Sequence, residues 1–148
     1  MATRFVLIAG LVVLIGGIAG CSSSQPAASQ RPAGALPVGT AQVTIDAADA
    51  ATLGSVNCTQ ADSLVTITAG DNAGGMTALV DLASKPAVKS VSIHNLSGFT
   101  GSYWQDLGSP AQISTGTKTY EITGSADGFH TDSPSFRKTE TFSVKVAC

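Results

Sequence analysis

Three cysteines carry the most reactive side chains of this 148-residue chain, and they lie far apart, at Cys21, Cys58 and Cys148. A thiolate can attack an electrophile, pair in a disulfide or ligate a metal ion. Zinc ligands usually come in close pairs, and neither the cysteines nor the two histidines, His94 and His130, are spaced that way. The sequence therefore predicts anchoring and cross-linking chemistry, without a metal site.

The first of these cysteines follows a segment that is typical of an export signal. Residues 1–20 comprise a short basic start at Arg4, an apolar run and the small pair Ala19-Gly20. The apolar run, of roughly 14 residues, is shorter than the roughly 20 that a permanent membrane span needs. Ile18-Ala19-Gly20-Cys21 resembles the bacterial lipobox. The resemblance implies cleavage before Cys21, a diacylglycerol joined to the Cys21 sulfur by a thioether, and an acyl group on the new N-terminal amine. We expect no cofactor besides these covalent lipid groups. The alternative is an ordinary secretory signal with a chance cysteine at the cut.

Residues 21–40 are expected to form a flexible tether, because they are rich in Ser, Ala, Gln and Pro and have no apolar periodicity. The formal net charge of the chain is -2, and its basic residues are scattered. Nucleic-acid binding needs clustered Lys and Arg, so nucleic acid is excluded as a partner. Residues 41–148 remain as one β-rich globular domain.

This domain alternates apolar and polar residues with the period of a β-strand, and turn signals separate the alternating segments. We expect a small antiparallel β-sandwich or open barrel. The ambiguous segment Met76–Ala83 is interpreted as a strand. The alternating segments lie around Val43, Val65–Ala69, Val91–Ile93, Tyr120–Ile122 and Phe142–Val146, and the turn signals include Ser97-Gly98 and Asp127-Gly128.

Cys58 and Cys148 share the inward parity of the alternating residues around them, so both thiols should face the core. With Cys21 consumed by lipid, these two remain in an exported domain, where disulfides persist. We expect them to pair and to keep the final strand from fraying. Two buried free thiols are the alternative.

Candidate catalytic residues exist, but none has the context that its chemistry needs. Ser135 and Lys138 match a Ser-x-x-Lys nucleophile motif, which requires a helix start and partner motifs that are absent. Asp127, His130 and His94 could join a Ser-His-Asp arrangement only in space, and no nucleophile elbow occurs. We expect no catalytic residue and no enzyme.

The adjacent aromatics Tyr103 and Trp104 should face opposite sides of a strand, one packing inward and one exposed. An exposed aromatic can stack on a sugar or contact lipid. Trp104, Phe99 and Phe129 are therefore the candidate ligand contacts, and ordinary core and rim packing is the alternative.

Several short segments, in this order and at this spacing, resemble the LpqH-type lipoprotein antigens of mycobacteria. They are Val56–Thr59, Val65–Ile67, Val88–Ile93, Tyr120–Gly128 and Phe142–Cys148. The resemblance implies a non-enzymatic lipoprotein that is anchored in the cell membrane by its acyl chains and faces outward in the cell envelope. It further implies that a host pattern-recognition receptor senses the acylated N-terminus, and we expect a monomer. The alternative function is an envelope lipid- or glycan-binding module.

Overall fold

The computed structural model describes residues 34–48 and 51–148, and within these ranges the regular structure consists of β-strands. The ten strands are β1 (Thr40–Ile45), β2 (Ala51–Leu53), β3 (Asn57–Ala61), β4 (Leu64–Gly70), β5 (Gly75–Asp81), β6 (Ala87–Leu96), β7 (Phe99–Trp104), β8 (Gln112–Thr115), β9 (Thr119–His130) and β10 (Lys138–Ala147).

All strand pairs are antiparallel, and the hydrogen-bonded order is β2-β1-β10-β9-β7-β6-β5-β4-β3. The long strand β9 pairs with β7 through its C-terminal half and with β8 through its N-terminal half. Strand register shifts in two places, between Leu79 and Val80 and between Ile93 and Leu96. Such irregularities bend a sheet and raise its twist.

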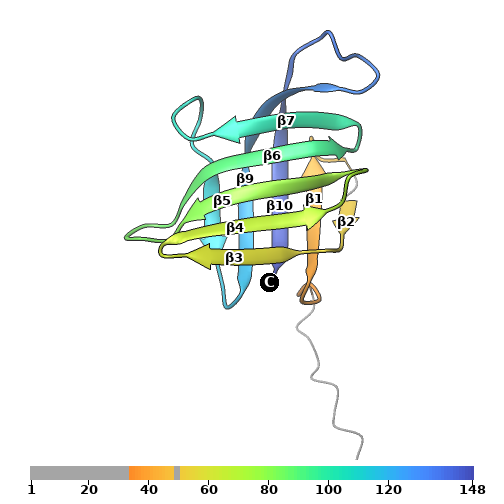
Figure 1. Ribbon diagram of the computed structural model, residues 1–148. Coiled ribbons are helices and arrows are strands. Elements are labelled where there is room, and N and C mark those ends of the chain that lie inside the picture. Colours follow the sequence, from red (N-terminus) through yellow and green to blue (C-terminus); the bar gives the residue numbers. More distant parts are fainter. Residues whose placement is uncertain (1–33, 49–50) are drawn as a thin grey trace, which may run out of the picture. The chain divides into compact units, whose positions relative to one another are not determined.

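The sheet curls into a half-barrel with two layers (Figure 1). Strands β3 to β7 form the front layer and run across β1, β9 and β10 behind them. This arrangement confirms the all-β, antiparallel, open-barrel prediction, including the strand interpretation of Met76–Ala83, most of which forms β5.

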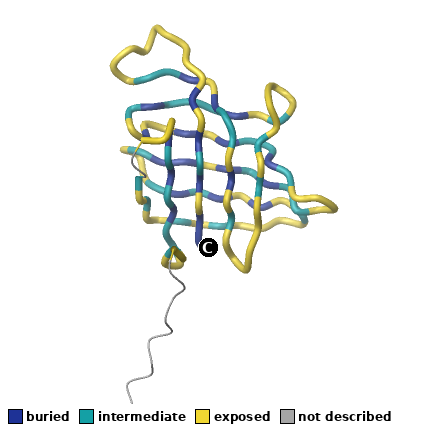
Figure 2. The backbone as a smooth tube through the Cα atoms, turned by 180° about the vertical axis from the view of Figure 1, so that it is seen from behind, coloured by how far each residue is buried: buried dark blue, intermediate teal, exposed yellow. Residues whose placement is uncertain are grey.

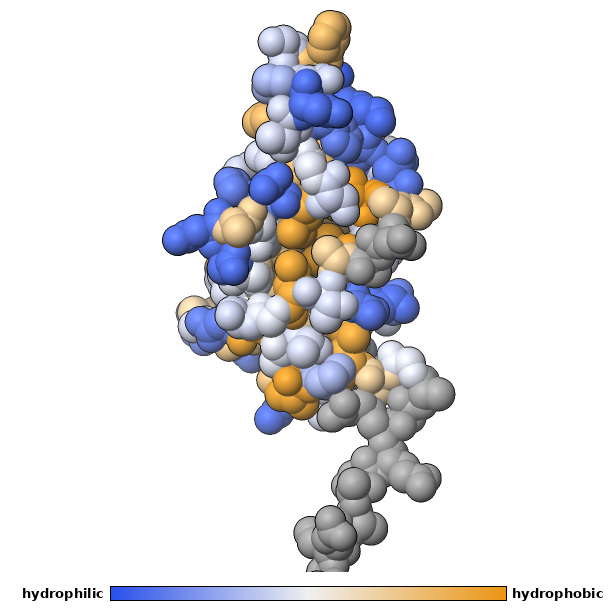
Figure 3. Space-filling view, turned by 90° about the vertical axis from the view of Figure 1, so that its right-hand side faces the viewer, coloured by the Kyte–Doolittle hydropathy of each residue, from blue (hydrophilic) through white to orange (hydrophobic). Residues whose placement is uncertain are grey.

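The core lies between the two layers, because alternate residues of each strand point inward. Buried and exposed residues alternate along the strands (Figure 2). In a side view, a band of apolar atoms lies between two largely polar layers (Figure 3). The fully buried residues include Val43, Ile67, Val91, Ile122 and Val144, one from each of five strands in both layers.

One turn signal proved wrong. Asp127-Gly128 does not end a strand; both residues lie within β9. Gly128 stands opposite Gly101 of β7, and a Cβ on Gly128 would clash with the Thr100 carbonyl oxygen. This glycine is required for the close approach of two backbones rather than for a turn. Ser97-Gly98, in contrast, does form the β6–β7 turn, with Gly98 at φ 76.

Candidate functional site

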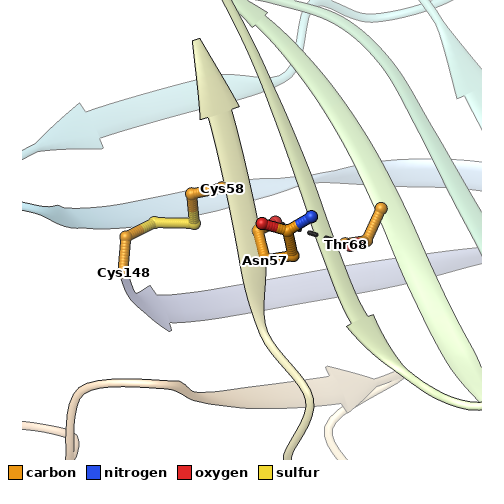
Figure 4. Close-up of a disulfide and its surroundings, with 4 residues drawn as sticks. All are labelled: Asn57, Cys58, Thr68 and Cys148. Carbon is orange, nitrogen blue, oxygen red and sulfur yellow. Dashed lines mark hydrogen bonds between the residues drawn. A yellow bond between two sulfur atoms is a disulfide. The ribbon is translucent and has the colours of Figure 1, made fainter.

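The predicted disulfide is present between Cys58 and Cys148, whose Cα atoms are 5.9 Å apart. Figure 4 shows Cys58 reaching from β3 to Cys148 just beyond the end of β10, while Asn57 turns the other way toward Thr68. Among the strands of residues 34–48 and 51–148, β3 ends the sheet order and pairs with β4 alone, so the bond ties this edge to the opposite layer.

The bond joins β3 to the residue after β10, and these two strands are held differently by the rest of the sheet. Strand β10 has β1 on one side and β9 on the other, and the paired residues extend to Ala147 on both sides. The Cys148 backbone N–H also donates to the Lys118 carbonyl at 2.8 Å. The final strand therefore has further restraints besides the disulfide, whereas β3 is an edge strand, and we expect β3 to depend more on the bond.

The candidate catalytic residues do not form a common site. Asp127 and His130 project from opposite faces of β9. Asp127 lies on the exposed face, whereas His130 lies on the inward face, opposite Phe99 of β7. The Lys138 amine pairs with Glu140, and Ser135 is exposed in the β9–β10 loop. Among residues 34–48 and 51–148, no hydrogen bond or ion pair links Ser135, His94 and His130.

Sequence reasoning missed a buried carboxylate near the N-terminal end of β10, that of Glu140. Glu140 is 2% exposed, and its Oε1 lies 3.0 Å from His130 Nε2 and also accepts from Lys138 Nζ. Its Oε2 has no hydrogen-bond partner within the described part of the chain. The hydrogen bond from Lys138 lowers the pKa of Glu140, burial opposes this, and the bond with His130 adds to the lowering. The same bond to Glu140 raises the pKa of Lys138.

The Glu140 carboxylate is enclosed by core side chains and engaged by His130 and Lys138. The His130 ring packs against Phe99 at 5.6 Å between centroids, and Glu140 is closed in by the core. A buried carboxylate needs such compensating partners. The sequence signal for it was available, because Glu140 has the same inward parity as Phe142 and Val144.

The three candidate ligand contacts lie in different environments. Phe99 is fully buried and belongs to the core. Trp104 is 56% exposed and projects from the outer face of β7. Phe129 is half-buried on the outer face of β9, opposite Thr100.

A groove crosses the outer face of the sheet near Trp104. It consists of three joined hollows, of about 420, 290 and 310 Å³. The first two share Ser102, Asp127 and Arg137, and the second and third share Ser92 and His94. We call these three hollows the outer groove. Within the described ranges no three His, Cys, Asp or Glu side chains gather as metal ligands.

Comparison with known proteins assigns the family. The model of the Mycobacterium 19 kDa lipoprotein antigen family matches residues 34–148. The chain belongs to this family. It is 32% identical to Lipoprotein LpqH of Mycobacterium tuberculosis over 161 residues, covering 97% of this chain and 96% of the relative. It is also 36% identical to a putative lipoprotein of Mycobacterium avium subsp. hominissuis over 123 residues, covering 82% and 84%.

Membership of a lipoprotein antigen family implies a lipid anchor in a membrane. The residue expected to carry the lipid, Cys21, and the expected signal peptide lie outside the described residues. In the described part of the chain, no helix has the length and hydropathy to cross a membrane.

Proposed function

We propose that the protein is an envelope lipoprotein that is acylated at Cys21, faces outward from the cell membrane and presents its half-barrel without catalysing a reaction. The family match over residues 34–148 carries this proposal, and the placement of Ile18-Ala19-Gly20-Cys21 directly before the expected tether supports it. The disulfide agrees with export, because such bonds persist in oxidising compartments.

Lipid on Cys21 would decide both attachment and recognition. A single acyl chain anchors a protein only marginally, whereas two or three chains hold it stably. The same acylated N-terminus would be the group that a host innate receptor senses, and the half-barrel would serve as its carrier. This division of roles needs no catalytic residue, in keeping with the engagement of Lys138 and His130 by Glu140.

Replacement of Cys21 by Ser tests the anchor. Cys21→Ser should abolish acylation, so that the intact mass shows no diacylglycerol or N-acyl group. The protein should be recovered either as uncut precursor or as released protein in the aqueous phase of Triton X-114. Ser22→Ala, one residue away, should partition and weigh as an acylated protein. A Cys21→Ser protein that still enters the detergent phase with an acylated mass would contradict the proposal.

Cytokine release from human macrophages tests the sensing step separately. Purified wild-type protein should stimulate release, and Cys21→Ser should lose that activity while keeping the melting temperature of the folded domain. Equal stimulation by both proteins would refute recognition through the lipid and leave the anchoring result unaffected.

A further inference from the structure

The outer face of the half-barrel carries a continuous row of polar side chains that crosses from β4 to β10. Directly paired positions place them side by side, one from each strand. The row runs Thr68, Thr77, Ser92, Ser102, Asp127 and Thr139. Neighbouring strands are about 4.8 Å apart, so the row presents hydroxyl groups at a regular short spacing.

The outer groove follows this row, and the largest of its three hollows has a distinctive set of groups. The hollow of about 420 Å³ contains Trp104, Asp127 and Arg137 together with serine and threonine hydroxyls. The β7–β8 loop forms its rim through Leu107, which is 78% exposed. A flat aromatic surface, an acceptor, a planar donor and several hydroxyls therefore converge in one concavity.

Both charged groups of this hollow are available to a ligand. Neither Asp127 nor Arg137 takes part in an ion pair with another residue of 34–48 or 51–148. Asp127 accepts a hydrogen bond from the Thr139 hydroxyl across the β9–β10 pair, which fixes the direction of its carboxylate. The second oxygen of that carboxylate remains free to accept from a ligand hydroxyl.

We propose that the outer groove binds a neutral glycan chain, with one sugar ring stacked on Trp104 and its hydroxyls bonded to Asp127 and Arg137. A sugar ring has an apolar C–H face that suits an indole and a rim of hydroxyls that both donate and accept. Further sugar units lie along the hydroxyl row toward His94, where the groove continues.

The charges in the groove favour a neutral ligand over an anionic one. Asp127 on the groove floor repels a phosphate or carboxylate, and it offsets the single guanidinium of Arg137. An acyl chain is disfavoured because the floor is a row of hydroxyls rather than apolar side chains. Trp104 and Asp127 lie on the paired strands β7 and β9, which fixes their backbone before binding and reduces the entropy cost of association.

The single tryptophan of the chain makes this site directly observable. The full lipidated protein, held in lauryldimethylamine oxide because that detergent has no sugar headgroup, is titrated with maltohexaose, with α-1,6-mannohexaose and with hexagalacturonate. The proposal predicts a saturable change in Trp104 emission with a neutral hexasaccharide and a weaker response to the anionic one. No change with either neutral chain, or a stronger response to hexagalacturonate, would overturn it.

Variants locate the binding within the groove. Asp127→Asn and Arg137→Gln should each raise the dissociation constant about tenfold or more, as expected for the loss of a hydrogen bond to a charged group. Trp104→Ala should abolish the heat of binding in calorimetry. The matched controls are Glu121→Gln, an exposed carboxylate on the same face of β9, and Phe136→Ala, an exposed aromatic outside the groove. Equal losses in controls and groove variants would refute the assignment.

Discussion

Reduction of the Cys58–Cys148 bond should destabilise the half-barrel strongly and release one particular strand. The perturbation is either a phosphine reductant or the double variant Cys58→Ala, Cys148→Ala. A thioether at Cys21, as proposed, is not cleaved by phosphine, so reduction acts on this bond alone. The two perturbations should give matching thermal stability, and the double variant should not respond to reductant.

The size of the effect follows from the length of chain that the bond closes. The two cysteines are 90 residues apart in sequence. In the chain-entropy model, closing a loop of this size removes about 4–5 kcal/mol of conformational freedom from the unfolded state. For a domain of this length, such a loss lowers the melting temperature by roughly 15–20 °C.

The position of the bond predicts where the structure loosens. In the part of the chain that the structure describes, β3 is an edge strand with β4 as its one partner, whereas β10 is paired on both sides. Hydrogen exchange of the reduced protein should therefore accelerate first at amides of Asn57–Ala61, while amides of β10 stay protected.

Circular dichroism melting curves of the full protein, with and without phosphine, measure the first effect, and exchange followed by mass spectrometry measures the second. A decrease of only a few degrees would show that the loop-closure argument overstates the role of the bond. Faster exchange in β10 than in β3 would show that the disulfide holds the C-terminal strand after all.

Two further predictions concern the core. Because hydrogen bonding to Lys138 lowers the pKa of Glu140 below its ordinary 4.5, ionised Glu140 stabilises the fold near neutral pH, and this stabilisation is lost as the pH falls through the lowered pKa. The melting temperature should therefore fall more steeply in acid for wild type than for Glu140→Gln, and parallel curves would contradict this. Gly128→Ala should cost about 1–3 kcal/mol in urea unfolding because its Cβ would meet the Thr100 carbonyl, whereas Gly108→Ala has open space and should cost little; equal costs would refute the close-approach argument.

Strand alternation predicted the fold because one face of each strand is buried and the other is solvated. The segments around Val43, Val91 and Ile122 were identified this way, and all three residues are buried. The same parity argument placed Cys58 and Cys148 on inward faces, which allowed their pairing to be predicted. The short strands β2 and β8 were not predicted, since three or four residues give too little periodicity to distinguish a strand from a loop.

Two polar residues show where pattern reasoning was incomplete. Glu140 fits the inward parity of β10, but composition rules place glutamate outside, and only the partners His130 and Lys138 make its burial tolerable. His130 and Lys138 lie on the same hairpin as Glu140. The contact between His130 and Glu140 nevertheless depends on the register of β9 against β10. Asp127 was interpreted as a turn residue because Gly128 follows it, although that glycine serves a close backbone approach.

The outer groove could not be predicted from the sequence for a related reason. Ser92, Ser102 and Thr139 are ordinary exposed strand residues, and they gain meaning only when pairing aligns them with Asp127. The alignment depends on two register shifts, one between β5 and β6 and one between β6 and β7. No local sequence pattern specifies where these shifts fall. Both clusters also meet at the start of β10, where Lys138 faces Glu140 inside and its neighbour Arg137 lines the groove outside. The buried carboxylate cluster and the outer groove therefore both draw on residues of the β9–β10 hairpin.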